Sequence, residues 1–210
     1  MRIVSPDFDR RIDLHGVGAC PRPVDIDRAQ HDFATLVSLR VYAFAAGMTI
    51  DGEAEEDEVY VVLMRGAAEV AVTCDGAEAG RWTLGVAGGP RAVYLPPLSS
   101  YRLIAREDSD VAYARAVPAG SVPAPAAFAP TAGWLASDHA TRMAMTLTGD
   151  GEIAPAASER FVHLRGAGAA TLGGVTLGDW DSALLDDGED AVLVVTHGEV
   201  EVLTVGAKGR

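Results

Sequence analysis

The chain has 210 residues, of which 49% are hydrophobic, with two cysteines and a formal net charge of −13. This length allows one large domain or two small ones that fold without disulfides. The acidic charge argues against nucleic-acid or anionic-membrane partners, because both require a basic surface. Cys20 and Cys74 have no motif spacing, which indicates reduced thiols. The first ten residues carry acids where a signal peptide has its apolar stretch, so we expect a cytoplasmic protein.

The first part of the chain predicts an arm followed by a set of short strands. Residues 1–33 are mixed in composition and predict an arm with one short strand. From residue 36 on, apolar residues alternate with polar ones or form short apolar runs, a pattern typical of half-buried and fully buried strands. The predicted strands cover residues 36–44, 59–64, 69–74, 91–95, 101–105 and 111–117.

A stretch rich in proline and alanine, residues 117–133, predicts a linker. A second set of strands follows it, at residues 143–148, 160–164, 169–172, 183–185, 191–196 and 199–205. Helix signals allow only one or two turns, at residues 25–30 and 133–140. We therefore predict an all-β chain with an arm and first unit over residues 1–117, a linker over 118–135 and a smaller second unit over 136–210.

An internal repeat supports two related units. Leu-Met-Arg-Gly at residues 63–66 and Leu-Arg-Gly at 164–166 are each followed by Thr-Leu-Gly, at 83–85 and 176–178. Each copy then continues into an apolar run that ends at a turn. Because a repeat of this size sets the architecture, the sequence predicts two small β-barrels or sandwiches in tandem.

The order of these features resembles the cupin superfamily. In the first half Gly47 precedes an acidic block at 53–58, an apolar strand then ends at Gly66, and a proline-marked turn follows at 94–101. In the second half Glu159 leads to a glycine in the corresponding place. The resemblance implies a bicupin, two tandem cupin-type β-barrels (double-stranded β-helix) with little helix, that forms a homodimer.

More narrowly, residues 39–117 resemble the N-terminal cupin of the 5-deoxy-glucuronate isomerase family of inositol catabolism. The text that carries this resemblance includes Val-Val-Leu-Met-Arg-Gly at 61–66 and Ala-Val-Tyr-Leu-Pro-Pro at 92–97. It implies a sugar acid as the small-molecule ligand. It also implies a reaction that removes a proton next to a carbonyl, with a divalent metal held by a histidine cluster and a glutamate in the second half.

The second half departs from the family pattern at the metal site. It contains only His139, His163 and His197, and none of them forms a His-x-His pair. No metal ligand can be transferred residue by residue, so the sequence predicts no particular cofactor, and a divalent metal stays an alternative without histidine ligands to support it. Glu53 and Glu55 take the approximate places of the first two cupin histidines and are weak candidates to bind a hard cation. The alternative is a solvated acidic turn.

Several other side chains are candidates for chemistry. Tyr101 takes the approximate place of the last cupin histidine and, with Glu58, is a candidate catalytic acid or base, although a buried tyrosine hydroxyl is as often structural. Arg40, Arg91 and Arg102 lie in or beside strands, and an inward-facing arginine would bind a carboxylate with both arms of its guanidinium. The alternative is that these arginines face outward. His163 is a further ligand-binding candidate, and the alternative for it is a structural role.

Three functions remain open from the sequence. The first is a sugar-acid isomerase in which carboxylates and Tyr101 replace the missing histidines. The second is a metal-free binding or regulatory bicupin, and the third is a structural paralogue with filled pockets. The contents of the barrels discriminate between them: polar residues around a cavity favour either of the first two, and packed aliphatic side chains favour the third.

Overall fold

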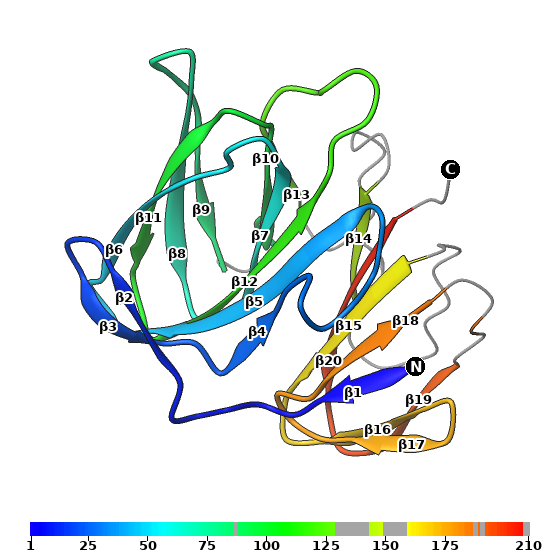
Figure 1. Ribbon diagram of the computed structural model, residues 1–210. Helices are drawn as coiled ribbons and strands as arrows, with labels where there is room; N and C mark the ends of the chain where they lie inside the picture. Colours follow the sequence, from blue (N-terminus) through cyan, green and yellow to red (C-terminus); the bar gives the residue numbers. More distant parts are fainter. Residues whose placement is uncertain (86–87, 129–142, 149–158, 187–188, 190–191, 208–210) are drawn as a thin grey trace.

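The strands of this chain form two lobes that lie side by side (Figure 1). The computed structural model describes residues 1–85, 88–128, 143–148, 159–186, 189 and 192–207. Over these ranges the chain forms strands β1 to β20 and no helix, so the all-β prediction is confirmed. Within the same ranges, no helix is available that could span a bilayer.

The first lobe is a sandwich of two antiparallel sheets. The larger sheet has, in order, β13 (Ala126–Phe128), β10 (Ala92–Leu95), β7 (Glu58–Arg65), β12 (Ser109–Ala116), β5 (Leu36–Phe44) and β4 (Val24–Ile26). The smaller sheet has β6 (Thr49–Glu53), β11 (Ser100–Ala105), β8 (Ala68–Cys74) and β9 (Ala77–Leu84). A separate hairpin of β2 (Arg11–Leu14) and β3 (Gly18–Pro21) packs on this lobe through Ile12, Leu14 and Cys20.

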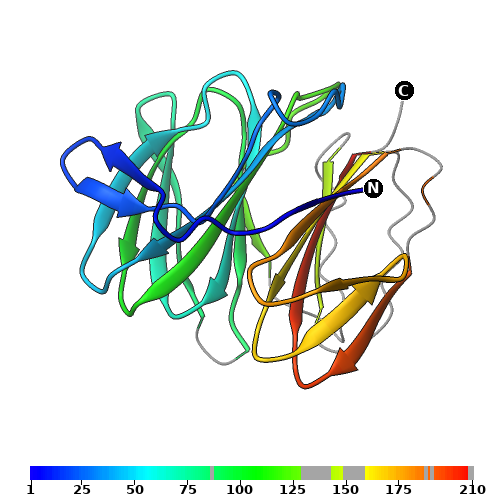
Figure 2. The ribbon, with the colours of Figure 1, turned by 60° about the horizontal axis from the view of Figure 1, so that its bottom comes forward.

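The second lobe repeats the two-sheet design with fewer strands (Figure 2). Its larger sheet has, in order, β1 (Arg2–Val4), β18 (Ser182–Leu185), β15 (Glu159–Arg165), β20 (Glu201–Ala207) and β14 (Met143–Thr148). Its smaller sheet has β17 (Val175–Leu177), β16 (Ala169–Leu172) and β19 (Leu193–His197).

Two pairings cross the domain limits expected from the sequence. The first strand of the arm, β1, pairs with β18 of the second lobe, and β13, inside the predicted linker, pairs with β10 of the first lobe. Free backbone groups at a sheet edge favour such additions. The limits 1–117, 118–135 and 136–210 themselves stay a prediction.

The internal repeat corresponds to a repeated arrangement of strands. In the first lobe β7 lies between β10 and β12, and in the second β15 lies between β18 and β20. The N–H of Leu63 donates to the Arg91 carbonyl (2.7 Å), and the N–H of Leu164 donates to the Asp181 carbonyl (3.0 Å). Gly66 and Gly166 follow these strands with φ of 87° and 132°, a region that favours glycine.

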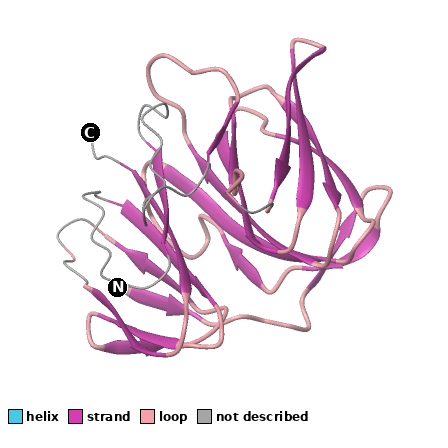
Figure 3. Cartoon of the chain, turned by 180° about the vertical axis from the view of Figure 1, so that it is seen from behind, coloured by secondary structure: helices cyan, strands magenta, loops and turns pink. Residues whose placement is uncertain are grey.

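Strand alternation distributes the apolar side chains among three cores. Along β7, Val59, Val61 and Leu63 point into the first lobe, whereas Tyr60 and Val62 point toward the second lobe. The larger sheets of both lobes therefore meet face to face across one shared core, with the smaller sheets outside (Figure 3). A third core, made of aliphatic side chains, fills the second lobe. A continuous apolar run predicts this burial of β7 on both faces.

Candidate functional site

The first lobe holds a cavity of about 210 Å³ between its two sheets. The strand alternation that places Val59 inside also turns the polar members of β5 and β12 inward, since side chains two apart share a face. The cavity wall is thus both aromatic and charged. The polar residues that line it are Arg40, Tyr42, Asp51, Glu53, Glu55, Tyr101, Tyr113 and Arg115, although the Asp51 carboxylate itself pairs with Arg102 on the outer face of the smaller sheet.

Three tyrosines form the aromatic part of the wall. The rings of Tyr42 and Tyr113 meet edge to face with centroids 5.4 Å apart, and Tyr101 lies 5.8 Å from Tyr113. Burial raises the pKa of Tyr101 to about 12. Burial also raises the pKa of Tyr113 well above its ordinary range, and the neighbouring Tyr101 raises it further. Both hydroxyls are therefore protonated at neutral pH and can donate hydrogen bonds to a ligand.

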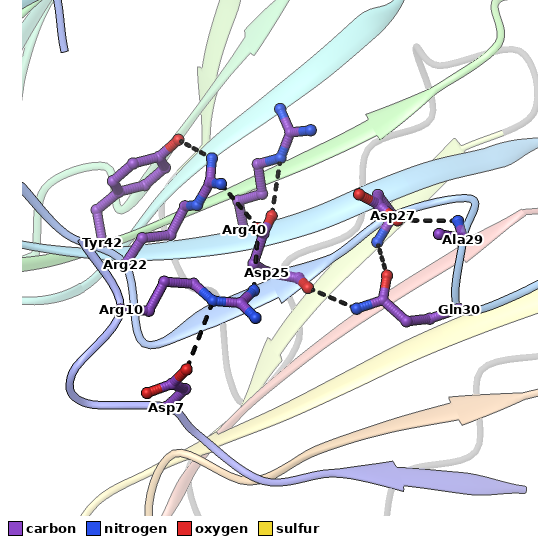
Figure 4. Close-up of polar contacts among 9 residues, drawn as sticks. All are labelled: Asp7, Arg10, Arg22, Asp25, Asp27, Ala29, Gln30, Arg40 and Tyr42. Atoms are coloured by element: carbon purple, nitrogen blue, oxygen red, sulfur yellow. Dashed lines mark hydrogen bonds and ion pairs between the residues drawn. The ribbon is translucent and has the colours of Figure 1, made fainter. Parts of the chain in front are cut away.

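Arg40 is held from one side by Asp25 (Figure 4). The Nε of Arg40 donates to Oδ1 of Asp25 over 3.2 Å, while its two terminal nitrogens point away from that carboxylate. Among the described residues these two nitrogens have no hydrogen-bond partner. Because Arg40 also lines the cavity, it presents an unused guanidinium fork there.

Asp25 is shared by three guanidinium groups. It accepts from Arg22 (2.7 Å) and forms an ion pair with Arg10 (3.0 Å) besides binding Arg40. Arg22 also donates to the Tyr42 hydroxyl over 3.3 Å and lies 5.7 Å from the centre of that ring. Asp7 also pairs with Arg10 (3.8 Å), so two carboxylates face three guanidinium groups and leave an excess of one positive charge at this corner, which favours an anion.

The acidic block lies at the rim of the cavity and is held by Arg115. This guanidinium donates to Glu55 (2.9 Å) and to the carbonyls of Glu53 and Ala54 (2.9 and 2.7 Å). Arg115 is thus largely occupied, unlike Arg40. In the part of the chain that the structure describes, no three His, Cys, Asp or Glu side chains gather as metal ligands. Glu53 and Glu55 therefore lack the third ligand that a cation site would need.

Glu58, predicted as a catalytic partner of Tyr101, lies on the other side of β7 and does not line the cavity. Its side chain is 1% exposed, and its Oε2 accepts a hydrogen bond from the Tyr94 hydroxyl over 3.0 Å. Burial raises the pKa of Glu58 to about 7, against a smaller lowering by Tyr94. The proposed catalytic role of Glu58 does not fit this position, because Glu58 shares a strand face with Tyr60, which points toward the second lobe.

Three further candidates also lie away from the cavity. Arg91 joins the lobes through Glu201 (2.7 and 2.9 Å), and Arg102 lies on the outer face of its sheet, paired with Asp51. His163 is fully buried on the face of β15 that lies toward the first lobe, where its Nδ1 is 2.9 Å from the Ser182 hydroxyl. These contacts are structural, so the proposed ligand-binding roles of Arg91, Arg102 and His163 do not fit their positions.

The interior of the second lobe is filled rather than hollow. The side chains that meet between its two sheets are aliphatic, among them Val162, Leu164, Leu172, Leu185 and Val202. The histidine metal centre that the resemblance implies does not fit these described residues, and His139 lies outside them. The candidate site of this chain is therefore the cavity of the first lobe.

Comparison with known proteins places the chain in a family. A model of the KduI/IolB family matches residues 21–133, which is more than half of the 210 residues. The chain belongs to the KduI/IolB family. The part of this KduI/IolB member that matches runs from the end of β3 through β13, and so includes the sheets that enclose the cavity. No curated protein matches the chain.

Solved structures similar to this KduI/IolB member share its fold. An IolB-like protein from Salmonella typhimurium LT2 has 14% identity and a TM-score of 0.64, covering 99% of this chain and 92% of its own. A cupin 2 conserved barrel domain protein from Leptotrichia buccalis has 13% identity and a TM-score of 0.54, covering 98% and 92%. A mutant of Bacillus subtilis oxalate decarboxylase has 8% identity and a TM-score of 0.68, covering 99% and 77%. At these identities the likeness shows the fold alone, and it confirms the predicted bicupin.

The sequence did not single out four residues that build the site: Asp25, Tyr42, Tyr113 and Arg115. For the last two a signal was present, because Tyr113 and Arg115 alternate with alanines in the predicted strand over 111–117. Asp25 had none. It lies 15 positions from Arg40 and meets that side chain only because β4 pairs with β5.

Proposed function

We propose that this chain binds a small sugar acid, or a similar polyhydroxylated carboxylate, in the cavity of its first lobe and does not turn it over. It would then be a ligand-binding or regulatory cupin. The observation that carries the proposal is the unused guanidinium fork of Arg40 in a wall of tyrosines.

The fork of Arg40 selects the carboxylate end of the ligand. A guanidinium can bind a carboxylate through two parallel N–H···O bonds, and both terminal nitrogens of Arg40 are available. Asp25 leaves this arrangement in place because it binds the Nε edge only. The side chain is 32% exposed, so the ion pair would form partly shielded from water, where it is stronger than on an open surface.

The remaining wall suits the hydroxyl groups and the ring of a sugar. The hydroxyls of Tyr42, Tyr101 and Tyr113 can donate or accept hydrogen bonds, and their rings offer apolar faces. The volume of about 210 Å³ is below the roughly 300–1,000 Å³ typical of sites for drug-sized ligands. A ligand with one ring is therefore favoured over a longer one.

The ionisation of the cavity favours binding over catalysis. An isomerase needs a base whose pKa lies near the working pH, to move a proton between neighbouring carbons. Tyr101, with a pKa raised to about 12 by burial, stays protonated and is a poor base at neutral pH. Glu58 has a suitable pKa of about 7 but faces the other lobe. Membership of the KduI/IolB family keeps isomerisation as the second candidate.

Calorimetric titration with three matched compounds tests the proposal: glucuronate, its neutral amide glucuronamide, and inositol. We expect glucuronate to bind at least about tenfold more tightly than the amide. Arg40→Gln should remove this preference, whereas Arg81→Gln, which breaks an exposed ion pair outside the cavity wall, should keep it. Equal affinity for acid and amide, or an unaffected Arg40→Gln variant, would overturn the proposal.

A second measurement separates binding from turnover. Proton NMR of glucuronate incubated with the protein should show no conversion between aldose and ketose forms over hours. Conversion that requires Tyr101 or Arg40 would favour the isomerase instead. The same sample, with and without added zinc, manganese or iron, reports whether a metal changes the outcome.

A further inference from the structure

Tyr101 lies across Gly52 on the neighbouring strand β6. The two residues are cross-strand partners, and a Cβ added to Gly52 would come within 2.5 Å of the Tyr101 ring and hydroxyl. Real Cβ atoms do not approach so closely, so the ring rests directly on the backbone of Gly52. A glycine facing an aromatic residue across two strands allows such close packing.

The two strands that carry this pair separate two spaces. On one side is the cavity of about 210 Å³, and on the other is an open hollow of about 650 Å³ on the outer face of the smaller sheet. Four residues line both spaces, namely Asp51, Gly52, Glu53 and Tyr101. The paired strands β6 and β11 form the wall between the two spaces, and the ring of Tyr101 lies on the cavity side of that wall.

We propose that the Tyr101–Gly52 pair sets the size of ligand that the site accepts, limiting it to a single sugar ring. This inference rests on the proposed binding of a sugar acid in the cavity. The ring of Tyr101 fills the part of the cavity next to β6, and Gly52 lets it lie flat against that strand, which leaves room for one sugar ring beside it.

Substitutions at the two members of the pair should change the space for a ligand in opposite directions. Tyr101→Ala removes the ring and enlarges the cavity on its inner side, which gives room for a longer acid. Gly52→Ala places a methyl group where the ring now lies and pushes the ring into the cavity, which leaves less space for any ligand. A purely structural role would lower the affinity for short and long ligands equally in both variants.

Gly80 and Trp82 on β9 supply a matched control. A Cβ on Gly80 would lie within 2.5 Å of two ring atoms of Trp82, so an aromatic ring covers a glycine here too, along one strand instead of across two, and neither residue lines the cavity or the hollow. Gly80→Ala and Trp82→Ala therefore report the general cost of disturbing a glycine–aromatic pair in this lobe.

Titration with glucuronate and with a disaccharide that ends in a glucuronic acid residue tests the inference. The wild type should prefer the monosaccharide acid by at least about tenfold, and Tyr101→Ala should reduce that ratio by about tenfold or more. Gly52→Ala should weaken glucuronate binding at least about fivefold, and both β9 variants should keep the wild-type ratio.

The outcomes distinguish the two proposals. A wild type that binds neither acid overturns the proposed function and this inference with it. A wild type that binds both acids equally, or a Tyr101→Ala variant with an unchanged ratio, overturns the size limit and leaves the function in place. If Tyr101→Ala does not fold, the Gly52→Ala result decides, because unweakened glucuronate binding there also overturns the inference.

Discussion

Replacing Glu58 by glutamine should change how the stability of this protein depends on pH. Glu58 is 1% exposed in the core shared by the two lobes, and its Oε1 has no hydrogen-bond partner among the described residues. Burial raises its pKa from 4.5 to about 7. The unfolded chain therefore releases this proton near pH 4.5 and the folded chain only near pH 7, so the folded state binds more protons between these values.

The sign and size of the effect on stability follow from the difference between the folded and unfolded pKa values. A raised pKa gives a contribution to the free energy of unfolding that is fully present below pH 4.5 and is lost as pH rises through 7. A difference of about 2.5 units at about 1.4 kcal/mol each amounts to about 3 kcal/mol. Glu58→Gln removes the ionisation and keeps an oxygen that accepts from Tyr94.

Urea unfolding at half-unit steps from pH 4.5 to 8 measures the effect. The difference in free energy of unfolding between Glu58→Gln and wild type should move by about 3 kcal/mol in favour of the variant across this range. Glu56→Gln, a change at an exposed carboxylate nearby, should show no such trend. A difference that stays constant with pH would refute the reasoning, because it would mean that Glu58 ionises equally easily in both states.

Three other variants test the packing between and beside the lobes. Burial is the main cause that lowers the pKa of His163 to about 3. The neutral side chain therefore contributes stability that is lost at about 1.4 kcal/mol per pH unit as pH falls from 6.5. In His163→Gln the free energy of unfolding should fall less steeply with decreasing pH, as measured by acid unfolding followed by circular dichroism. Asp25→Asn should lower the free energy of urea unfolding by about 3 kcal/mol, because it leaves three guanidinium groups without their shared carboxylate. Glu159 accepts hydrogen bonds from the N–H groups of residues 34–36 across the lobes, so Glu159→Ala should cost about 2 kcal/mol and speed amide exchange there; unchanged exchange would contradict the contact.

Much of the architecture could be predicted because its causes are local. The alternation over residues 36–44 and the unbroken apolar run over 59–64 predict strands, and both form where expected. The half-buried prediction for residues 36–44 is wrong, because β5 contributes Leu39 and Val41 to the core between the lobes and Tyr42 and Phe44 to the core of the first lobe. The two Arg-Gly turns at Gly66 and Gly166 end equivalent strands, as the internal repeat indicates. Arg40 was a candidate because it lies in a predicted strand, and Tyr101 because of its place in the cupin pattern; both line the cavity.

The composition of the site was harder to predict because it depends on contacts between distant segments. Glu58 and Tyr101 belong to one cupin-like pattern, yet they lie on opposite sides of the first lobe's larger sheet. Arg91 seemed suited to a carboxylate ligand, but its carboxylate partner is Glu201, 110 positions away. The unused fork of Arg40 becomes visible only once Asp25 is seen to take its Nε edge.

By itself, the sequence determined the all-β class, the tandem repeat and the face of each strand to which a side chain belongs, because strand periodicity is a property of neighbouring residues. Only the tertiary structure decided what each face meets. One face of β7 encloses a polar cavity and the other packs on the second lobe, whose own interior is filled with aliphatic side chains. The physical reason is that docking of sheets is set by the summed packing of residues far apart in the chain, which no local pattern records.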